Sequence, residues 1–365
     1  MSDHTKELNV IIVGAGPAGI SIAYRLKHEL GFDDFTIYEK LDGVGGTWRT
    51  NIYPGCGYNR KSHLYSFSFN LNPNWSKELC EQPEILQYME DTVDQFDLRK
   101  HVHSLVECVG AKWINEESKW EVPLKDMKTG IEYSRKATVF VSAVSAISYP
   151  RDVKFPGLET FEGAMFHTAR RDHSVVPAVA KDAAFVKQYA RSGQWFHDRP
   201  NRDYSKLDKF LLRWVPLWQR WLRLKIFFDA DDETTTYFPT PKGTKMRAAV
   251  EDGFDIIVLA TGFQVTQFLT PMHIAYLGFL ANNSALFACE TQAEYAVKSL
   301  IKSLIKPLID RQATVIESTN AIHQELRNTV FAGDCSNWYI GDYGRNAASW
   351  PRFARGYWFA TVVPD

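Results

Sequence analysis

Residues 8–21 read "LNVIIVGAGPAGIS", a short apolar run followed by three closely spaced glycines. The run is rich in β-branched residues and shows no polar alternation, which is typical of a strand buried in a parallel sheet. Gly14, Gly16 and Gly19 then form a GxGxxG pattern that leads into a helical periodicity. The first glycine permits a tight turn, the second lets a pyrophosphate approach the backbone, and the third lets helix and strand pack closely. The N-terminus of such a helix attracts phosphate.

A second strand is expected at "FTIYEK", residues 35–40, and its acidic residue Glu39 falls 20 residues after Gly19. A carboxylate at this distance accepts hydrogen bonds from a ribose 2′-hydroxyl and disfavours a 2′-phosphate. Strand, glycines, helix, strand and acid in this order favour an adenine-dinucleotide site over a purely structural glycine turn. The residues predicted to bind this part of the cofactor are Gly14, Gly16, Pro17, Ala18, Gly19, Glu39 and Lys40.

A second glycine-rich segment follows at residues 41–69, "LDGVGGTWRTNIYPGCGYNRKSHLYSFSF". Its glycines could wrap a pyrophosphate, and its aromatic side chains could flank a flat ring system. An ordinary aromatic-rich loop is the alternative, and it would be preferred if this segment stood alone.

Composition restricts the remaining possibilities. The 365 residues are 45% hydrophobic with a net charge of −1, so we expect one large or two modest domains and no nucleic-acid partner. No run of about 18 apolar residues indicates a membrane-spanning helix. No HExxH pattern, Ser-His-Asp order or metal-ligand spacing indicates a hydrolase or a metal site. The odd, dispersed cysteines favour reduced thiols and a cytoplasmic location; they are Cys56, Cys80, Cys108, Cys289 and Cys335.

Several of these motifs resemble those of one family. "GAGPAG", Glu39, "GGTW", "YPG" and "SHLYSFSF" are similar to the FAD-binding half of class B flavoprotein monooxygenases, especially Baeyer–Villiger monooxygenases, within the flavin-containing monooxygenase superfamily. Three later segments extend the resemblance over nearly the whole chain: "FPGLETFEGAMFHTARR" (155–171), "FDIIVLATGF" (254–263) and "WYIGDYGRNAASWPRFARGYWFAT" (338–361).

The resemblance implies an α/β fold with a Rossmann-type FAD-binding domain, a truncated second nucleotide-binding domain and a helical region. Residues 1–150 and 250–365 would form the two parts of the FAD domain, and 151–249 a nicotinamide-domain remnant with the helical segment. Members of the family bind FAD, reduce it with NADPH and use O2 to insert an oxygen atom next to a ketone. The resemblance places Gly46, Thr47, Trp48, Asn59 and Tyr65 around the flavin. It assigns no catalytic residue. His167 could be a catalytic base, but a role in linking domains through hydrogen bonds is preferred.

The family's NADPH site requires a second glycine-rich turn, and this chain has no glycine between Gly163 and Gly193. Without one, a pyrophosphate cannot approach the backbone in the usual way. Near Arg247 the family has a substantial insert with a Lys-Arg pair, and the chain passes directly into the strand at 254–263. Three substitutions depart from the family pattern: Asn59 replaces an aspartate, Ser145 a glycine and Arg171 a tryptophan.

Two interpretations follow from these gaps. The chain is either a degenerate flavoprotein or a gene model with coding segments omitted, and the abrupt joins between well-kept motifs favour the second. The function expected by descent is Baeyer–Villiger oxygenation, impaired here because the NADPH-binding loop is absent. A non-catalytic FAD-binding protein and a flavin oxidoreductase without oxygen insertion are the alternatives.

Two further segments have helical patterns. Residues 210–228, "FLLRWVPLWQRWLRLKIFF", combine tryptophans with basic residues and are interrupted by Pro216. They could lie on a membrane surface, although a core-facing helix is the preferred interpretation. Residues 295–312 have apolar side chains at three- and four-residue spacing, which predicts a helix packed on the core.

Overall fold

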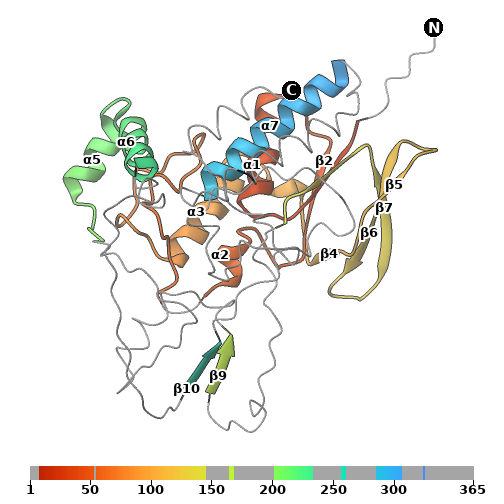
Figure 1. Ribbon diagram of the computed structural model, residues 1–365, viewed down its shortest axis with the longest axis horizontal. Coiled ribbons are helices and arrows are strands. Elements are labelled where there is room, and N and C mark those ends of the chain that lie inside the picture. The colour runs from red at the N-terminus through yellow and green to blue at the C-terminus, as the bar shows by residue number, and fades with distance from the viewer. Residues whose placement is uncertain are drawn as a thin grey trace.

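A computed structural model describes residues 8–52, 55–144, 164–167, 201–232, 256–259 and 285–305, together with residue 324 (Figure 1). Several features predicted from the sequence lie outside these residues. They are Ser145, Arg171, Arg247, the C-terminal motif at 338–361 and all but the first few residues of the glycine-free segment.

The centre of the fold is a four-stranded parallel sheet in the order β3-β2-β1-β8. Its strands are β1 (Val10–Val13), β2 (Phe35–Glu39), β3 (Val102–Ser104) and β8 (Val139–Ser142). Both strands predicted around the first glycine loop are therefore confirmed, as is the α/β class. β1 lies between two neighbours and is buried along most of its length, which explains its continuous apolar sequence.

Several helices lie beside this sheet (Figure 1). They are α1 (Pro17–Tyr24) with a π-helical turn at Arg25–Glu29, the short α2 (Thr47–Thr50), α3 (Gln82–Gln95) with a 3-10 turn at Arg99–His101, and α7 (Ala285–Ile305). α7 lies along α1 although about 260 residues separate them. It begins ten residues before the helix predicted at 295–312, and the part of that prediction after residue 305 lies outside the described residues. The prediction began too late because buried Leu286 already belongs to the apolar face that continues at Ala293 and Val297.

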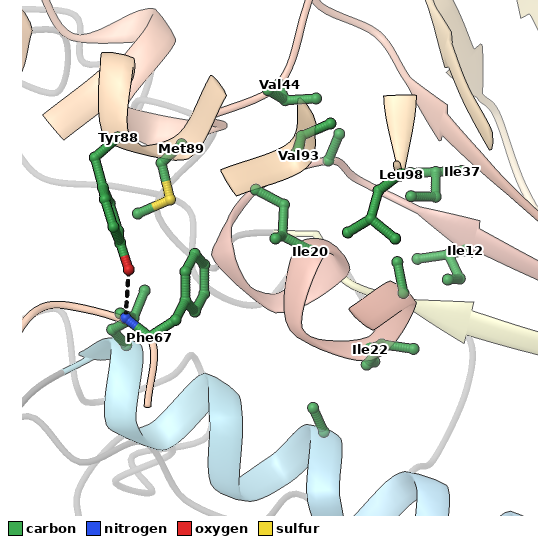
Figure 2. Close-up of a cluster of buried hydrophobic side chains, with 14 of the residues drawn as sticks. Ile12, Ile20, Ile22, Ile37, Val44, Phe67, Tyr88, Met89, Val93 and Leu98 are labelled. Atoms are coloured by element: carbon green, nitrogen blue, oxygen red, sulfur yellow. Dashed lines mark hydrogen bonds between the residues drawn. The ribbon is translucent and has the colours of Figure 1, made fainter. Parts of the chain in front are cut away.

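The main hydrophobic core lies between the sheet and these helices (Figure 2). Ile12 and Ile37 of the sheet and Ile20 of α1 belong to this core, and all three are almost completely buried. Each such side chain contributes roughly 1.5–3 kcal/mol relative to exposure. The loop before α3 is fixed to this core, since the Phe67 amide donates a hydrogen bond of 2.8 Å to the Tyr88 hydroxyl.

An antiparallel sheet is inserted between β3 and β8. It consists of β4 (Val106–Cys108), β5 (Lys112–Ile114), β6 (Lys119–Asp126) and β7 (Glu132–Ala137), with β6 paired to the other three. Val122 and Leu124 of β6 pack in a second core cluster with Ile11 and Tyr38 of the parallel sheet.

The remaining described elements follow residue 160. β9 (Ala164–His167) and β10 (Ile256–Leu259) pair in parallel as a separate two-stranded sheet, so the strand predicted at 254–263 forms but pairs with β9. α5 (Lys206–Trp214) and α6 (Trp218–Asp232) form a helical hairpin. Pro216 lies between them, as the predicted interruption requires, and Ser205 and Asp208 form a capping box at the start of α5. Domain boundaries at 150 and 249 stay a prediction.

Candidate functional site

The first glycine loop connects β1 to α1 at the carboxyl edge of the parallel sheet. Gly14 has φ +103°, and a Cβ there would lie 2.7 Å from the Ala143 carbonyl oxygen at the end of β8. A Cβ on Gly19 would lie 2.0 Å from the Gly14 carbonyl oxygen. Both contacts are shorter than any side chain tolerates, so the packing of the loop on the sheet requires these two glycines.

Gly16 is different. Its φ of −79° is open to any residue, and an added Cβ would make only an ordinary contact, 3.6 Å from Gly46 Cα. Gly16 is the N-cap of α1 and provides no side-chain cap, while Pro17 at the first helical position has no N–H. The amide N–H groups of Ala18 and Gly19 thus begin the helix without an intrahelical partner, an arrangement that suits an anion.

Glu39 ends β2 beside this loop with only 5% of its surface exposed. Its Oε2 accepts a hydrogen bond of 2.7 Å from the Ala15 amide, and its Oε1 accepts one of 2.9 Å from the Leu41 amide. The carboxylate therefore fixes the loop itself, a role that the sequence did not indicate. Each oxygen has a second lone pair, which leaves acceptor capacity for a hydroxyl group. Lys40 follows directly and is half-buried.

The structure brings the second glycine loop against the first. The Gly45 amide donates a hydrogen bond of 3.0 Å to the Ala15 carbonyl oxygen. Gly46 has φ +55°, and its Cβ would lie 3.0 Å from Gly16 Cα. Thr47 and Trp48, which open α2, therefore directly follow a residue that contacts the start of α1.

Arg49 holds the second loop in place and was missed by the sequence analysis. Its Nε donates a hydrogen bond of 2.8 Å to the Val44 carbonyl oxygen, and one terminal nitrogen lies 3.0 Å from the Asp42 carboxylate. The other terminal nitrogen pairs with Glu90 of α3. The arginine directly after "GGTW" was the available signal, but its partners are set by the tertiary structure.

An aromatic group adjoins the second loop. The Trp48 ring meets the Tyr58 ring edge-on at 5.1 Å between centroids, and the Tyr58 and Tyr65 rings lie 4.3 Å apart. The Tyr58 hydroxyl donates a hydrogen bond of 3.0 Å to the Tyr65 carbonyl oxygen. Burial raises the pKa of both phenols well above the usual 10, so they stay neutral. Asn59 is exposed beside this group.

The first and second loops therefore lie together, and the rings of Trp48 and Tyr65 lie beside the second loop. The expected flavin contacts of Gly46, Thr47, Trp48, Asn59 and Tyr65 stay a prediction. Only the backbone of His167 is described, in β9. Across the described ranges, no three His, Cys, Asp or Glu side chains form a candidate metal site.

Comparisons with known proteins agree with this geometry. Residues 12–82 match the family model of the NAD(P)-binding Rossmann-like domain. A Baeyer-Villiger monooxygenase of Streptomyces coelicolor is 26% identical over 96% of this chain and 91% of its own length. A Baeyer-Villiger monooxygenase of Pseudomonas aeruginosa is 34% identical over 59% of this chain and 43% of its own length. The FAD-binding monooxygenase ktnD of Aspergillus niger is 25% identical over 94% of this chain and 78% of its own length.

Solved structures share the fold. The closed crystal structure of cyclohexanone monooxygenase superposes with a TM-score of 0.73 at 22% identity, covering 97% of this chain and 96% of that chain. An ε-caprolactone-bound structure of cyclohexanone monooxygenase gives a TM-score of 0.72 at 21% identity, with 97% of each chain covered.

The alignment with the Streptomyces protein also measures what this chain lacks. It spans 477 positions, whereas the chain has 365 residues. At least 112 positions (477 less 365) therefore place a residue of the relative opposite a gap in this chain.

Proposed function

We propose that this chain, a homologue of Baeyer–Villiger-type flavin monooxygenases and by family a FAD-dependent oxidoreductase, binds FAD across its two glycine loops. The observation that carries the proposal is the first loop, in which Gly14 and Gly19 admit no Cβ and the buried Glu39 carboxylate lies alongside. The free amides at the start of α1 would hold the pyrophosphate, and Glu39 the adenosine ribose.

The residues present fit this cofactor. Gly16 has no side chain where the two loops meet, and Glu39 retains acceptor capacity for a ribose hydroxyl. The Trp48, Tyr58 and Tyr65 rings would shield the flavin end from water, and their neutral phenols would bring no charge to it. FAD, when bound, supplies hydride acceptance and reaction with O2. No residue of this chain is assigned a proton transfer.

The reaction proposed by descent is oxygen insertion next to a ketone in a small molecule, with NADPH as reductant. The relatives named as Baeyer-Villiger monooxygenases and the neighbour bound to ε-caprolactone support this substrate class. The glycine-free segment after Gly163 supports impaired NADPH use in this chain. The same segment favours a non-catalytic FAD-binding protein, or a flavin oxidoreductase without oxygen insertion, as the second candidate. A cytoplasmic location stays a prediction.

The first experiment is to purify the chain, record its visible spectrum and identify the released cofactor by chromatography. We expect a yellow protein that releases FAD and, once stripped, takes up FAD in preference to FMN or NAD. A protein that stays colourless with excess FAD would contradict the proposal. Oxygen uptake with NADPH and a panel of cyclic ketones then separates an oxygenase from a non-catalytic binder.

A further inference from the structure

The helix α6 has apolar side chains on two opposite faces. On one face Leu222, Ile226 and Ala230 pack against Leu64 in a small buried cluster. The opposite face carries exposed large apolar side chains, namely Trp218, Trp221, Leu224 and Phe228. A helix that is hydrophobic all round is ordinarily covered on both sides.

The helix α5 and the connecting turn extend this exposed face. Leu207, Phe210 and Trp214 of α5 are exposed at helical spacing, and Leu217 in the turn is 70% exposed. Nine of the fifteen exposed large hydrophobic residues in the described part of the chain fall in this hairpin. We call these nine residues the α5–α6 face: Leu207, Phe210, Trp214, Val215, Leu217, Trp218, Trp221, Leu224 and Phe228. Isolated exposed apolar residues are ordinary, but a concentration of this kind marks a contact surface.

The same hairpin carries a net positive charge. Residues 206–232 contain six lysines and arginines against four aspartates; three of these, Asp229, Asp231 and Asp232, lie at the far end of α6, and Asp208 is paired with Arg202 at 2.8 Å. Arg213 and Arg220 are exposed beside the tryptophans. Tryptophan and leucine with flanking lysine and arginine form the composition of helices that lie in a bilayer interface.

A cavity of about 310 Å³ lies at the corner of the hairpin. Its lining is mixed, with apolar side chains such as Leu71 and Leu212 beside Arg213 and Arg220. Gln219 also lines it, and within the described residues its amide Nε2 is buried without a hydrogen-bond partner. Two guanidinium groups beside apolar side chains suit an anionic headgroup attached to an acyl chain.

These observations favour one occupant. A second copy of the chain would place the same basic surface against itself in a two-fold interface, and like charges would oppose each other. No described helix is long and apolar enough to cross a membrane. We propose that the α5–α6 face docks on the surface of an anionic bilayer. Its aromatic side chains would enter the boundary between headgroups and acyl chains, and its corner cavity would receive a lipid phosphate.

The test uses the full chain and vesicles of phosphatidylcholine, alone or mixed with phosphatidylglycerol in equal parts. We expect co-flotation with the mixed vesicles only, a blue shift of tryptophan fluorescence on binding, and weaker binding as salt is raised. Trp218→Ser with Trp221→Ser should lower partitioning by about tenfold or more. Arg213→Gln with Arg220→Gln should remove the preference for anionic lipid.

Trp113→Ser is the matched control, because Trp113 is an exposed tryptophan on β5, away from this face. It should leave vesicle binding unchanged. Equal binding to neutral vesicles, or none to either kind, would overturn the proposal. So would complete inhibition by soluble glycerol phosphate, or a dimer that the Trp218 and Trp221 substitutions dissociate. None of these readouts depends on flavin, so the outcome is independent of the proposed oxygenase function.

Discussion

Gly19 and Gly16 lie three residues apart in the first glycine loop, yet an added methyl group would meet different neighbours at the two positions. In Gly19→Ala the new Cβ would lie 2.0 Å from the Gly14 carbonyl oxygen, so the loop must move and stability should fall by about 1–3 kcal/mol. In Gly16→Ala it would make a 3.6 Å contact, so stability should change by less than about 0.5 kcal/mol.

FAD affinity should nevertheless fall by about tenfold or more in Gly16→Ala, because the methyl group occupies the approach of the pyrophosphate. Urea unfolding and flavin fluorescence titration measure the two quantities, and unchanged FAD affinity in Gly16→Ala would exclude the loop as the cradle.

Glu39→Gln tests the role of the carboxylate more specifically than Glu39→Ala does, because it keeps the size of the side chain and removes only its charge. Both of its carboxylate oxygens accept hydrogen bonds from backbone N–H groups, at Ala15 and Leu41. A glutamine can accept only one of them, and its own NH2 would face the other donor. We expect Glu39→Gln to weaken FAD binding by about tenfold to a hundredfold, equivalent to about 1.5–3 kcal/mol for a lost charge-assisted bond. Equal FAD titrations for the variant and the parent protein would show that this carboxylate holds the loop without contributing to FAD binding.

For single residues, the sequence predicted which residues belong to the site better than it predicted the groups that they contact. The glycines and Glu39 could be found because their spacing is set by one local unit of strand, turn and helix. The hydrogen bond between Ala15 and Glu39 and the ion pair between Arg49 and Glu90 join segments that only folding brings together. Local periodicity contains no information about such contacts.

Among the elements, α6 and α7 are joined by a buried ion pair that also holds the loop carrying Tyr65. Arg223 lies 3.1 Å from the Glu290 carboxylate and donates to the carbonyl oxygens of His63 and Ser66. The other Glu290 oxygen accepts from the Ser68 amide at 2.7 Å and from its hydroxyl at 2.6 Å. The pair thus connects three segments that are far apart in sequence.

Glu290→Ala should lower the free energy of unfolding by about 3–5 kcal/mol, because it leaves the Arg223 charge without its buried partner. Asp229→Ala provides the matched control. It removes the exposed Lys225–Asp229 pair on α6, the helix that carries Arg223. The loss of this pair should lower the free energy of unfolding by less than about 0.5 kcal/mol. Urea denaturation measures both, and equal losses in the two variants would contradict the role given to Glu290.

His63 next to this pair predicts a pH dependence. Burial, together with the Arg223 guanidinium, lowers the pKa of His63 from 6.5 to about 4, and its ring packs edge-on against Tyr204. The folded state therefore holds His63 neutral, whereas the unfolded chain binds a proton below pH 6.5. Stability should be greatest above pH 6.5 and decline as pH falls towards 4. Between pH 7 and pH 5 the loss from this group is about 2 kcal/mol. His63→Phe keeps the ring packing and should remove this part of the pH dependence of urea unfolding, and an unchanged slope would refute the assignment.

The elements themselves were predictable where one periodicity dominates. β1 and β2 are continuous apolar runs, and Pro216 marks the break between α5 and α6. The two-sided character of α6 was not foreseen, because apolar residues on both faces blur the helical pattern that would separate core from surface. The core-facing interpretation of residues 210–228 is therefore correct for Leu222 and Ile226 but wrong for Trp218 and Trp221.

At the scale of the whole molecule, this chain lacks segments that its Streptomyces relative has. A relative matches 96% of this chain with at least 112 of its own aligned positions facing gaps, so aligned segments are joined where the relative has intervening residues. The parallel pair of β9 and β10 brings the block around 164–167 directly beside the block around 256–259. The sequence predicts that the NADPH loop is among these missing segments, since no glycine lies between Gly163 and Gly193.

The final prediction concerns electron entry into the bound flavin. Without a second glycine-rich turn, no backbone can approach the NADPH pyrophosphate closely, so NADPH should bleach the flavin of this chain very slowly. Dithionite should bleach the same sample at once, which shows that the flavin is intact.

If coding segments were omitted, the transcript will contain in-frame sequence near Val175–Val176, Glu251–Asp252 and Gly278–Asn282. The first insert should encode a strand followed by GxGxxG or GxGxxA, and restoring it should restore rapid reduction by NADPH. A transcript that matches this chain residue for residue would leave a degenerate FAD-binding protein as the better account. Rapid NADPH-driven reduction by the chain as it stands would contradict both, because it requires a nicotinamide site built without the glycine turn.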